Sequence, residues 1–445
     1  MKEKENRSNK WVKGFSKLSK EQKIDWVTTR YFHSPDSAKK ILENYWNKDS
    51  NVQLLHDEFI ENAVSNFYLP LGVAPNFIIN QQAFTIPMAT EESSVLAAAG
   101  KSAKFWASRG GFSTKIIGTE KIGQVHFMFN GNTHKIKNFI ASIQSVLRSE
   151  TDAITANMRA RGGGITTIEL CDKTDAIANY YQLHVTFETI DSMGANFINS
   201  CLEQFGTTLK QEALRYDAFS DEEKNIEIVM CILSNHVPQC VVRAEVSCPV
   251  EQLNDDNELS PQAFCEKFIR AIDIANADIH RAVTHNKGIM NGVDAVVIAT
   301  GNDFRAVEAG AHAYASSSGS YKSLTHATVE NDVFRYWIEI PLALGTVGGI
   351  TKLHPMVQWS LELLGNPSAK QLMEVVAVAG LAQNFAALRS LITSGIQKGH
   401  MKMHLMNILN QFKASQTEKQ QLIAYFKNHT VSFSAVENEL LKIRS

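Results

Sequence analysis

Four short segments near the middle of the chain have the apolar and polar spacing of β-strands. They are residues 121–129, 165–171, 181–187 and 225–233. Two further segments, residues 133–148 and 193–205, repeat their apolar residues at the three- and four-residue intervals of a helix face. The predicted order is β-α-β-β-α-β, the ferredoxin-like arrangement, over residues 113–235.

The flanking sequence has a helical pattern. Residues 14–60 are predicted to be mostly helical, and residues 67–101 to contain loop and short strand before a helix that begins near Ser93. Ser260 followed by Pro261 indicates the start of another helix, which we expect to end before Asn286. The remainder is expected to be mostly helical.

These elements predict an α+β fold with three parts. The first is a large, mainly helical domain formed by residues 1–112 and 236–394. A small α+β domain of residues 113–235 is inserted in it, and residues 395–445 form a helical C-terminal flap.

Composition narrows the range of functions. With 445 residues, 44% of them hydrophobic, the chain is long enough to bury a substantial core. A net charge of −2 gives no field for nucleic acid or an anionic membrane. The charged first residues lack the apolar core of a signal peptide, and no apolar run is long enough to span a bilayer, so we expect a cytoplasmic protein. The six cysteines lack metal-type spacing, which favours free, buried thiols and no metal.

Charged residues stand in unusual surroundings at two places. Lys287 lies among glycines and asparagines, and Asp303 follows an apolar segment of residues 293–300. A structural ion pair explains this arrangement, but so does a lysine that stabilises an oxyanion with an aspartate to orient it. Similarly, Glu91 and Glu92 precede an alanine-rich helix, where they act either as favourable helix-start charges or as a proton donor.

Two further stretches carry candidate chemistry. Gly194 and Ala195 leave the predicted start of a helix without bulky side chains, so a phosphate can approach its amides. His400 and His404 share a helical face, but Met401 stands where a zinc protease has its glutamate. These histidines are therefore either polar helix residues or a proton donor near neutral pH.

Taken together, these stretches resemble hydroxymethylglutaryl-CoA (HMG-CoA) reductase in its soluble, class II bacterial form. The family's motifs occur in its order as PMATEES, DSMGANFIN, RAVTHNKGIMNG, GNDFRAVEA, GTVGG, GLAQNFAALRSL and GHMKMH. Two positions depart from the family pattern: Ser93 stands where proline is frequent, and Ser16, next to Lys17, stands where an arginine for the CoA phosphates is expected.

The resemblance implies a fold and an activity. The large domain binds the CoA thioester, the small domain binds NADH or NADPH, and the flap closes over the site. The implied reaction reduces HMG-CoA to mevalonate and CoA with two NAD(P)H, or runs in reverse. The implied assembly is a homodimer, or a higher even oligomer, with its active site at the subunit interface.

The resemblance also implies roles for individual residues. The catalytic residues are Glu92, Lys287, Asp303 and His400, with Asp303 linking Lys287 to Glu92. The substrate-binding residues are Ser94, Arg281, Thr284, Asn291 and Asn384. The cofactor-binding residues are Asp191, Met193, Gly194, Ala195 and Asn196.

Several points stay open at this stage. A dehydrogenase of another acyl-CoA and an inactive CoA-ester-binding homologue are the alternatives. Arg159 and Arg161 are positioned in the sequence to meet a 2′-phosphate, but they do not decide between NADH and NADPH. The direction of the reaction and the role of residues 410–445 are also open.

Overall fold

The structure is a computed structural model that describes residues 10–253, 259–393, 395, 405–426 and 429–445. It contains two compact units, Met1–Pro70 with Lys352–Pro355, and Leu71–Thr351 with Met356–Ser445. The first unit is helical, as expected. Its elements are η1 (Phe15–Lys17), α2 (Lys20–Tyr31), α3 (Pro35–Asn44) and α4 (Ser50–Asp57).

The first unit is held by a few specific contacts. Ser19 begins α2 with a capping box in which Gln22 returns the hydrogen bond. Lys20 donates to Asp57 at 2.7 Å and so connects α2 to α4. The ring of His354 stacks on Phe59, which brings residues far apart in sequence into the same unit.

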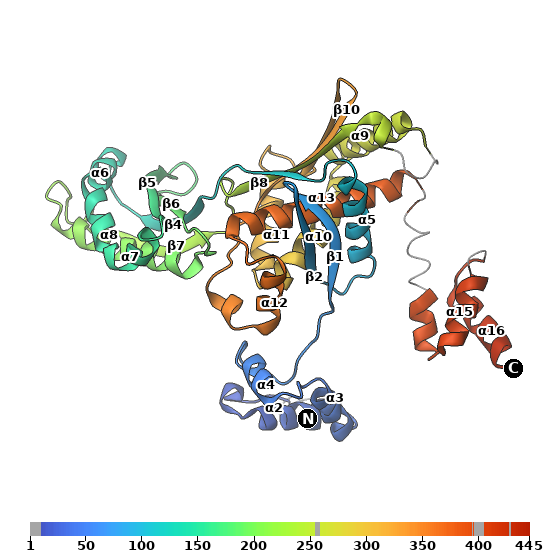
Figure 1. Cartoon of the computed structure of the whole chain (residues 1–445). Coiled ribbons are helices and arrows are strands. Elements are labelled where there is room, and N and C mark those ends of the chain that lie inside the picture. Colours follow the sequence, from blue (N-terminus) through green and yellow to red (C-terminus); the bar gives the residue numbers. More distant parts are fainter. Residues whose placement is uncertain (1–9, 254–258, 394, 396–404, 427–428) are drawn as a thin grey trace. The chain divides into compact units, whose positions relative to one another are not determined.

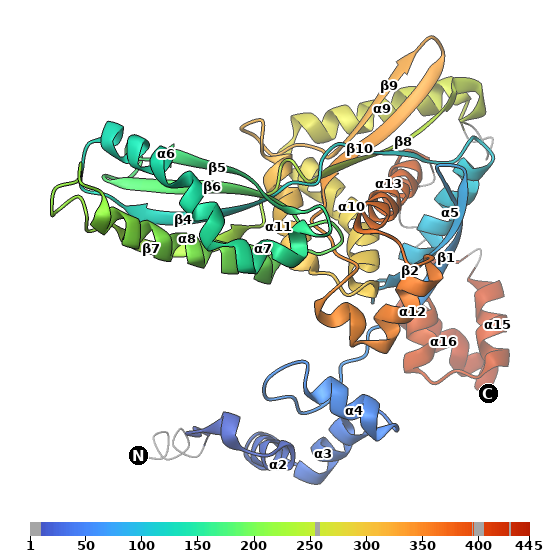
Figure 2. The same ribbon diagram turned by 60° about the vertical axis from the view of Figure 1, so that its left-hand side comes forward.

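The second unit contains the remaining elements (Figures 1 and 2). Its strands are β1 (Leu71–Ile79), β2 (Gln82–Ala89), β3 (Ser113–Ile116), β4 (Lys121–Met128), β5 (Gly164–Asp172), β6 (Tyr180–Glu188), β7 (Glu227–Ser234), β8 (Val241–Pro249), β9 (Thr325–Glu330) and β10 (Val333–Pro341). Its helices are α5 (Val95–Ala107), α6 (Thr133–Glu150), α7 (Asp152–Arg159), α8 (Ala195–Arg215), η2 (Val250–Gln252), α9 (Pro261–Ala277), α10 (Ile279–Ala299), α11 (Phe304–Ala315), η3 (Gly349–Lys352), α12 (Pro355–Leu363), α13 (Ala369–Ile392), α15 (Gln416–Tyr425) and α16 (Phe433–Arg444).

The predicted ferredoxin-like arrangement is confirmed. Strands β4, β5, β6 and β7 form one antiparallel sheet in the order β5-β6-β4-β7. Helices α6 and α8 pack on this sheet through a core that includes Phe139, Leu202 and Phe205. The apolar spacing of residues 133–148 and 193–205 therefore marks the faces that bury these helices.

A second four-stranded sheet was not anticipated from the sequence. Strands β3, β8, β10 and β9 form an antiparallel sheet in that order, and β1 pairs with β2 in a separate hairpin. Strand β10 is buried at Phe334, Tyr336 and Ile338, which is the alternation of a strand with one covered face. The large part of the fold thus has a sheet beneath its helices.

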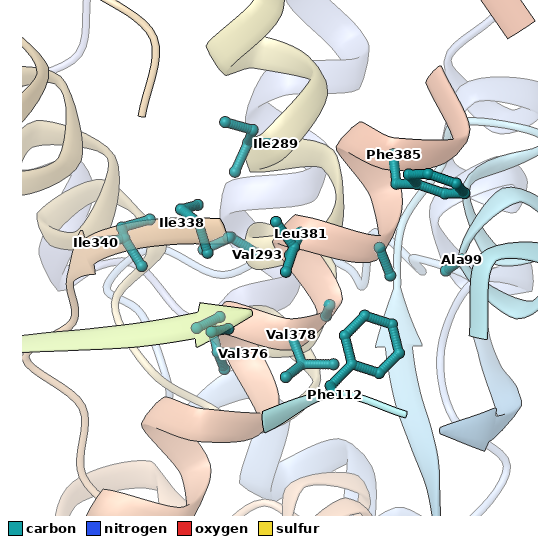
Figure 3. Close-up of a cluster of buried hydrophobic side chains, with 14 of the residues drawn as sticks. Ala99, Phe112, Ile289, Val293, Ile338, Ile340, Val376, Val378, Leu381 and Phe385 are labelled. Atoms are coloured by element: carbon teal, nitrogen blue, oxygen red, sulfur yellow. The ribbon is translucent and has the colours of Figure 1, made fainter. Parts of the chain in front are cut away.

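Helix α13 forms the centre of the main core. Figure 3 shows its Leu381 beside Val293 of α10 and its Val378 beside Phe112. Val376 and the apolar residues Ile338 and Ile340 of β10 belong to the same core. Within the described residues, α13 is the one helix whose length and composition would suit a membrane span. Most of it is buried in the protein, which accounts for its apolar character.

Helix α10 corrects one boundary. The helix that starts at Pro261 ends at Ala277, as α9, and α10 then continues from Ile279 through Lys287 to Ala299. Lys287 therefore lies on a regular helix and not in a glycine-rich pocket. Gly292 serves close helix packing, because a Cβ at this position would lie 2.4 Å from the Ala379 carbonyl oxygen of α13.

The residues described after α13 include a small helical cluster. Residues 405–411 are helical and, with α15 and α16, enclose an apolar core. Leu409, Leu422 and Val436 are its most buried members. This confirms that the described C-terminal residues are largely helical.

The tight α10–α13 contact leads to a matched test. Gly292→Ala should lower the free energy of unfolding by about 1–3 kcal/mol, because the new methyl group meets backbone that cannot move away cheaply. Gly288→Ala, on the same helix, has no atom closer than 3.9 Å to the new Cβ. It should be neutral or stabilise by about 0.5–1 kcal/mol through helix propensity. Urea denaturation of both variants measures this; equal effects would contradict the packing role of Gly292.

Candidate active site

An ion pair joins two of the predicted catalytic residues. The Nζ atom of Lys287 donates to Oε2 of Glu92 at 2.7 Å, although 195 residues separate them in sequence. Lys287 comes from the middle of α10, and Glu92 from the turn between β2 and α5. The side chains are 61% and 38% exposed, so both remain accessible to a ligand.

Four predicted site residues share one side of α10. Arg281, Thr284, Lys287 and Asn291 follow each other at intervals of three or four residues, which places them along one stripe of the helix. Residues such as Ile289 and Val293 on the opposite side are fully buried. The packing of α10 therefore determines where this polar stripe lies.

Asp303 has a different partner from the one expected. Its carboxylate caps the N-terminus of α11 and accepts from Arg305, with Oδ1 and Oδ2 lying 3.0 and 3.1 Å from the guanidinium nitrogens. Burial alone would raise the pKa of Asp303, but Arg305 and the first amides of α11 together hold this pKa below its usual value. Of the expected three-residue network, the structure contains the Lys287–Glu92 pair, while Asp303 is bound by Arg305.

Asn384 is buried in a polar network beneath α10. Its Oδ1 accepts from the hydroxyls of Tyr336 and Thr325, and its Nδ2 donates to the His285 carbonyl at 3.2 Å. The side chain is only 1% exposed. Through these hydrogen bonds Asn384 connects α13 and the β9–β10 hairpin to the turn of α10 that precedes Lys287.

The predicted cofactor residues lie at the start of α8. Gly194 is the N-cap residue with φ of 89°, and as a glycine it has no side chain to cap the amides that follow it. These amides and the positive end of a 21-residue helix dipole suit the diphosphate of a dinucleotide. Met193, Ala195 and Asn196 belong to this same turn.

Asp191 has structural partners. Its Oδ1 accepts from the amide of Ala369, at the start of α13, at 2.8 Å. Its main-chain oxygen accepts from the amides of Thr346 and Val347 in the GTVGG motif. Asp191 therefore connects the cofactor turn to the segment that leads into the core helix.

The remaining predicted residues are less informative. Ser94 is exposed at the N-terminus of α5 with φ of 74°. Arg159 pairs with Asp152, and Arg161 donates to the Asn157 carbonyl. His400 and His404 lie outside the described residues. Within those residues, no group of acidic, histidine or cysteine side chains is arranged to hold a metal ion.

Comparison with known proteins identifies the family. Residues 21–405 match the family model for hydroxymethylglutaryl-coenzyme A reductase. The chain belongs to the HMG-CoA reductase family. It is accordingly an NAD(P)-dependent oxidoreductase, and the alternatives of another acyl-CoA dehydrogenase or an inactive homologue are not favoured.

Individual relatives agree with this assignment. The chain is 37% identical to 3-hydroxy-3-methylglutaryl-coenzyme A reductase of Archaeoglobus fulgidus over 89% of this chain and 86% of the relative. It is 30% identical to a probable reductase of Borreliella burgdorferi over 97% of both chains.

Solved structures confirm the fold. A reductase structure from Streptococcus pneumoniae superposes with a TM-score of 0.71 at 32% identity, covering 97% of this chain and 99% of that one. A class II reductase structure from the same organism, bound to NADPH in open conformations, gives a TM-score of 0.70 at 33% identity, covering 85% and 99%. The predicted class II resemblance is therefore confirmed.

Some residues that shape this candidate site were not predicted from the sequence. Arg305 stands two residues after Asp303, so the two could have been recognised as an N-cap with an adjacent cation. Tyr336 and Thr325 belong to the unanticipated sheet, and no local pattern connects them to Asn384. Their role emerges only from the packing of β9 and β10 against α13.

A buried carboxyl pair lies between α10 and α11. Oδ1 of Asp294 is buried without a hydrogen-bond donor. Burial raises the pKa of Asp294 well above its usual value, and the neighbouring Glu308 carboxylate raises it further. A protonated Asp294 can donate to Glu308, which also binds His312 at 2.7 Å. A proton on Asp294 removes the repulsion between the two carboxylates.

The Asn384 network predicts a stability defect. Asn384→Leu removes the acceptor for the Tyr336 and Thr325 hydroxyls and the donor to the His285 carbonyl. It should lower the free energy of unfolding by about 2–4 kcal/mol, since buried polar groups lose their partners. Asn291→Leu, on the polar side of α10, should change it by less than about 0.5 kcal/mol. Similar small effects for both variants in urea denaturation would contradict a structural role for Asn384.

The carboxyl pair predicts a pH-dependent stability. Asp294 has a higher pKa folded than unfolded, so the folded state binds more protons between these values and loses stability as pH rises through that window. Asp294→Asn should therefore flatten the decline in unfolding free energy from pH 5 to 8 by more than about 1 kcal/mol. Asp273→Asn, exposed on α9, is the control. Parallel curves for Asp294→Asn and the parent protein would refute the proton on Asp294.

Proposed function

We propose that this reductase converts HMG-CoA to mevalonate and CoA with two equivalents of NAD(P)H. The observation that carries this proposal is the Lys287–Glu92 ion pair, formed by two of the family's motifs beside the polar side of α10. The reaction first creates an oxyanion, which a cation can stabilise, and later requires a proton, which a carboxyl group can supply. The ion pair brings both kinds of group to one place.

Lys287 is proposed to stabilise the oxyanion. Hydride addition to the thioester carbonyl carbon places negative charge on the carbonyl oxygen, giving a hemithioacetal. An ammonium group has three donors, and Glu92 uses one of them, so two can reach the oxygen. The position of Lys287 on a packed helix keeps this charge in place before the reaction begins.

Glu92 is proposed to supply the proton to the aldehyde intermediate in the second reduction, after its carboxylate has taken up a proton from water. Its contact with Lys287 sets its carboxyl group beside the oxygen that Lys287 binds. Asp303 and His400 complete the proposed catalytic set, with His400 protonating the departing CoA thiolate. For Asp303 to join Lys287 and Glu92, its carboxylate has to exchange the Arg305 guanidinium for the lysine.

The proposed substrate contacts come mainly from α10. Arg281, Thr284 and Asn291 offer a guanidinium, a hydroxyl and an amide beside Lys287. They suit the free carboxylate and hydroxyl of HMG-CoA. Ser94 adds a hydroxyl near Glu92. Asn384 is proposed to support the substrate site indirectly, by its hydrogen bond to the His285 carbonyl of α10.

The proposed dinucleotide site is the first turn of α8. NADH or NADPH supplies the hydride when bound, and a relative from Streptococcus pneumoniae is solved with NADPH. The uncapped amides after Gly194 support this location. Asp191 holds this turn through its main-chain oxygen, and Met193 and Ala195 line the cavity beside it. Asn196 follows Ala195 in the first turn of α8.

Three further proposals follow from the family. The domains are residues 1–112 with 236–394, residues 113–235, and residues 395–445. The active unit is a homodimer, or a higher even oligomer, with the site at the subunit interface. The enzyme works in the cytoplasm.

Lys287→Met provides the direct test. It removes the charge that stabilises the oxyanion and keeps most of the side-chain volume. Oxidation of NADH and NADPH with HMG-CoA should fall by about 10²- to 10³-fold in kcat. Binding of HMG-CoA, measured by calorimetry, should weaken far less.

Lys267→Met is the matched control, because Lys267 is an exposed lysine on α9. It should leave turnover unchanged. A Lys287→Met variant that retains turnover within about threefold would overturn the proposed role. No oxidation of either dinucleotide by the parent protein would overturn the proposed function itself.

A further inference from the structure

Lys121 is a buried lysine at the first position of β4. The residue is 5% exposed, and within the described residues it forms no salt bridge. Its Nζ atom donates to the hydroxyl of Thr189 and, at 2.7 Å, to the carbonyl of Ser192. Burial lowers the pKa of Lys121. A buried amino group whose two partners are neutral oxygens contributes less to stability than an apolar side chain of the same size, so core packing alone does not explain a lysine here.

Both oxygens belong to the turn that connects β6 to α8. In this turn Ile190 has φ of 53°, which is a rare conformation for a β-branched residue. The Ile190 amide donates to Oε1 of Glu188 at 2.8 Å, and the Thr189 hydroxyl donates to the Ser192 carbonyl at 2.6 Å. Such strain persists only where surrounding contacts hold it.

Lys121 determines the direction of one backbone amide. The Ser192 carbonyl and the Met193 N–H belong to the same planar peptide unit and point in opposite directions. Because Lys121 and Thr189 both hold this carbonyl, they also fix the Met193 amide, immediately before the N-cap residue of α8. Met193 and Lys121 also line a common cavity.

Thr189, which Lys121 holds, also packs against Gly194. A Cβ at Gly194 would lie 2.5 Å from Cγ2 of Thr189, so the threonine methyl lies directly against the glycine. Thr189 is completely buried. One side of Thr189 therefore binds Lys121, and the other supports the left-handed residue that begins α8.

Asp191, between Thr189 and Ser192 in this turn, has separate partners. Asp191 binds the amides of Ala369 and Thr346, outside the ferredoxin-like sheet. Lys121 belongs to the sheet itself. The turn is thus held by two sets of hydrogen bonds, one from Lys121 and one to Asp191. The contact from Lys121 is the one that acts on the Ser192–Met193 peptide, next to the proposed dinucleotide site.

We propose that Lys121 is a positioning residue for the dinucleotide, which holds the Thr189–Gly194 turn so that the first amides of α8 are set to receive the cofactor's diphosphate. This inference rests on the proposed function of that turn. Lys121 acts through Thr189 and Ser192 and does not itself touch the reacting atoms.

The test compares Lys121→Met, Thr189→Val and the double variant in steady-state kinetics. Both single changes keep the side-chain shape and remove the polar contact. Each should raise the KM for the dinucleotide about tenfold, while kcat and the KM for HMG-CoA stay within about twofold. The double variant should be no worse than the more affected single variant, because both changes release the same turn. Dinucleotide Kd from fluorescence titration should follow KM.

Lys135→Met is the matched control, because Lys135 is a half-exposed lysine of the same domain that pairs with Glu223. It should leave all three constants unchanged. If Lys121→Met fails to fold, Thr189→Val alone decides the test. An unchanged dinucleotide KM in a folded variant overturns the inference, as does a loss confined to kcat and thermal stability. A parent enzyme that oxidises neither dinucleotide overturns the proposed function instead.

Discussion

The close contact between α10 and α13 is the constraint on which the site depends. At Gly292 the two helices approach so closely that a methyl group would meet the backbone of Ala379. Helix α10 is therefore fixed in rotation, with Ile289 and Val293 in the core. The polar stripe of Arg281, Lys287 and their neighbours faces away from that core as a consequence. A rotation of one residue, about 100°, would bury the lysine.

Apolar packing sets the rotation of α10, and buried hydrogen bonds then determine its position more closely. Asn384 binds the hydroxyls of Tyr336 and Thr325 and the carbonyl of His285, so it ties helix, helix and hairpin together at one point. Apolar packing tolerates small shifts, but hydrogen bonds in a buried site are directional and expensive to break. The network therefore determines how far α10 is shifted along the axis of α13. This shift also determines the position of Lys287 relative to Glu92.

The sequence predicted those features whose signals are local. The ferredoxin-like unit was readable because its strands and helices each carry their own periodicity. The second sheet was not, because β3, β8, β9 and β10 come from distant segments and pair only through tertiary structure. The site shows the same division. Motifs led to Lys287 and Glu92, which the structure brings into contact. The binding of Asp303 by Arg305 depends instead on the capping geometry of α11, and the buried position of Asn384 depends on the missed sheet.

The exposure of the Lys287–Glu92 pair bears on how the reaction is controlled. An ion pair in contact with water is worth little, because water screens both charges. The same lysine becomes a strong electrostatic catalyst when the surroundings are dry, since the interaction grows as the effective dielectric constant falls. In the mechanism that we propose, a bound thioester displaces water from the polar side of α10 and brings its carbonyl oxygen to the unused donors of Lys287. On that proposal the substrate helps to create the environment in which Lys287 works, and the exposed ion pair is the form of the site without substrate.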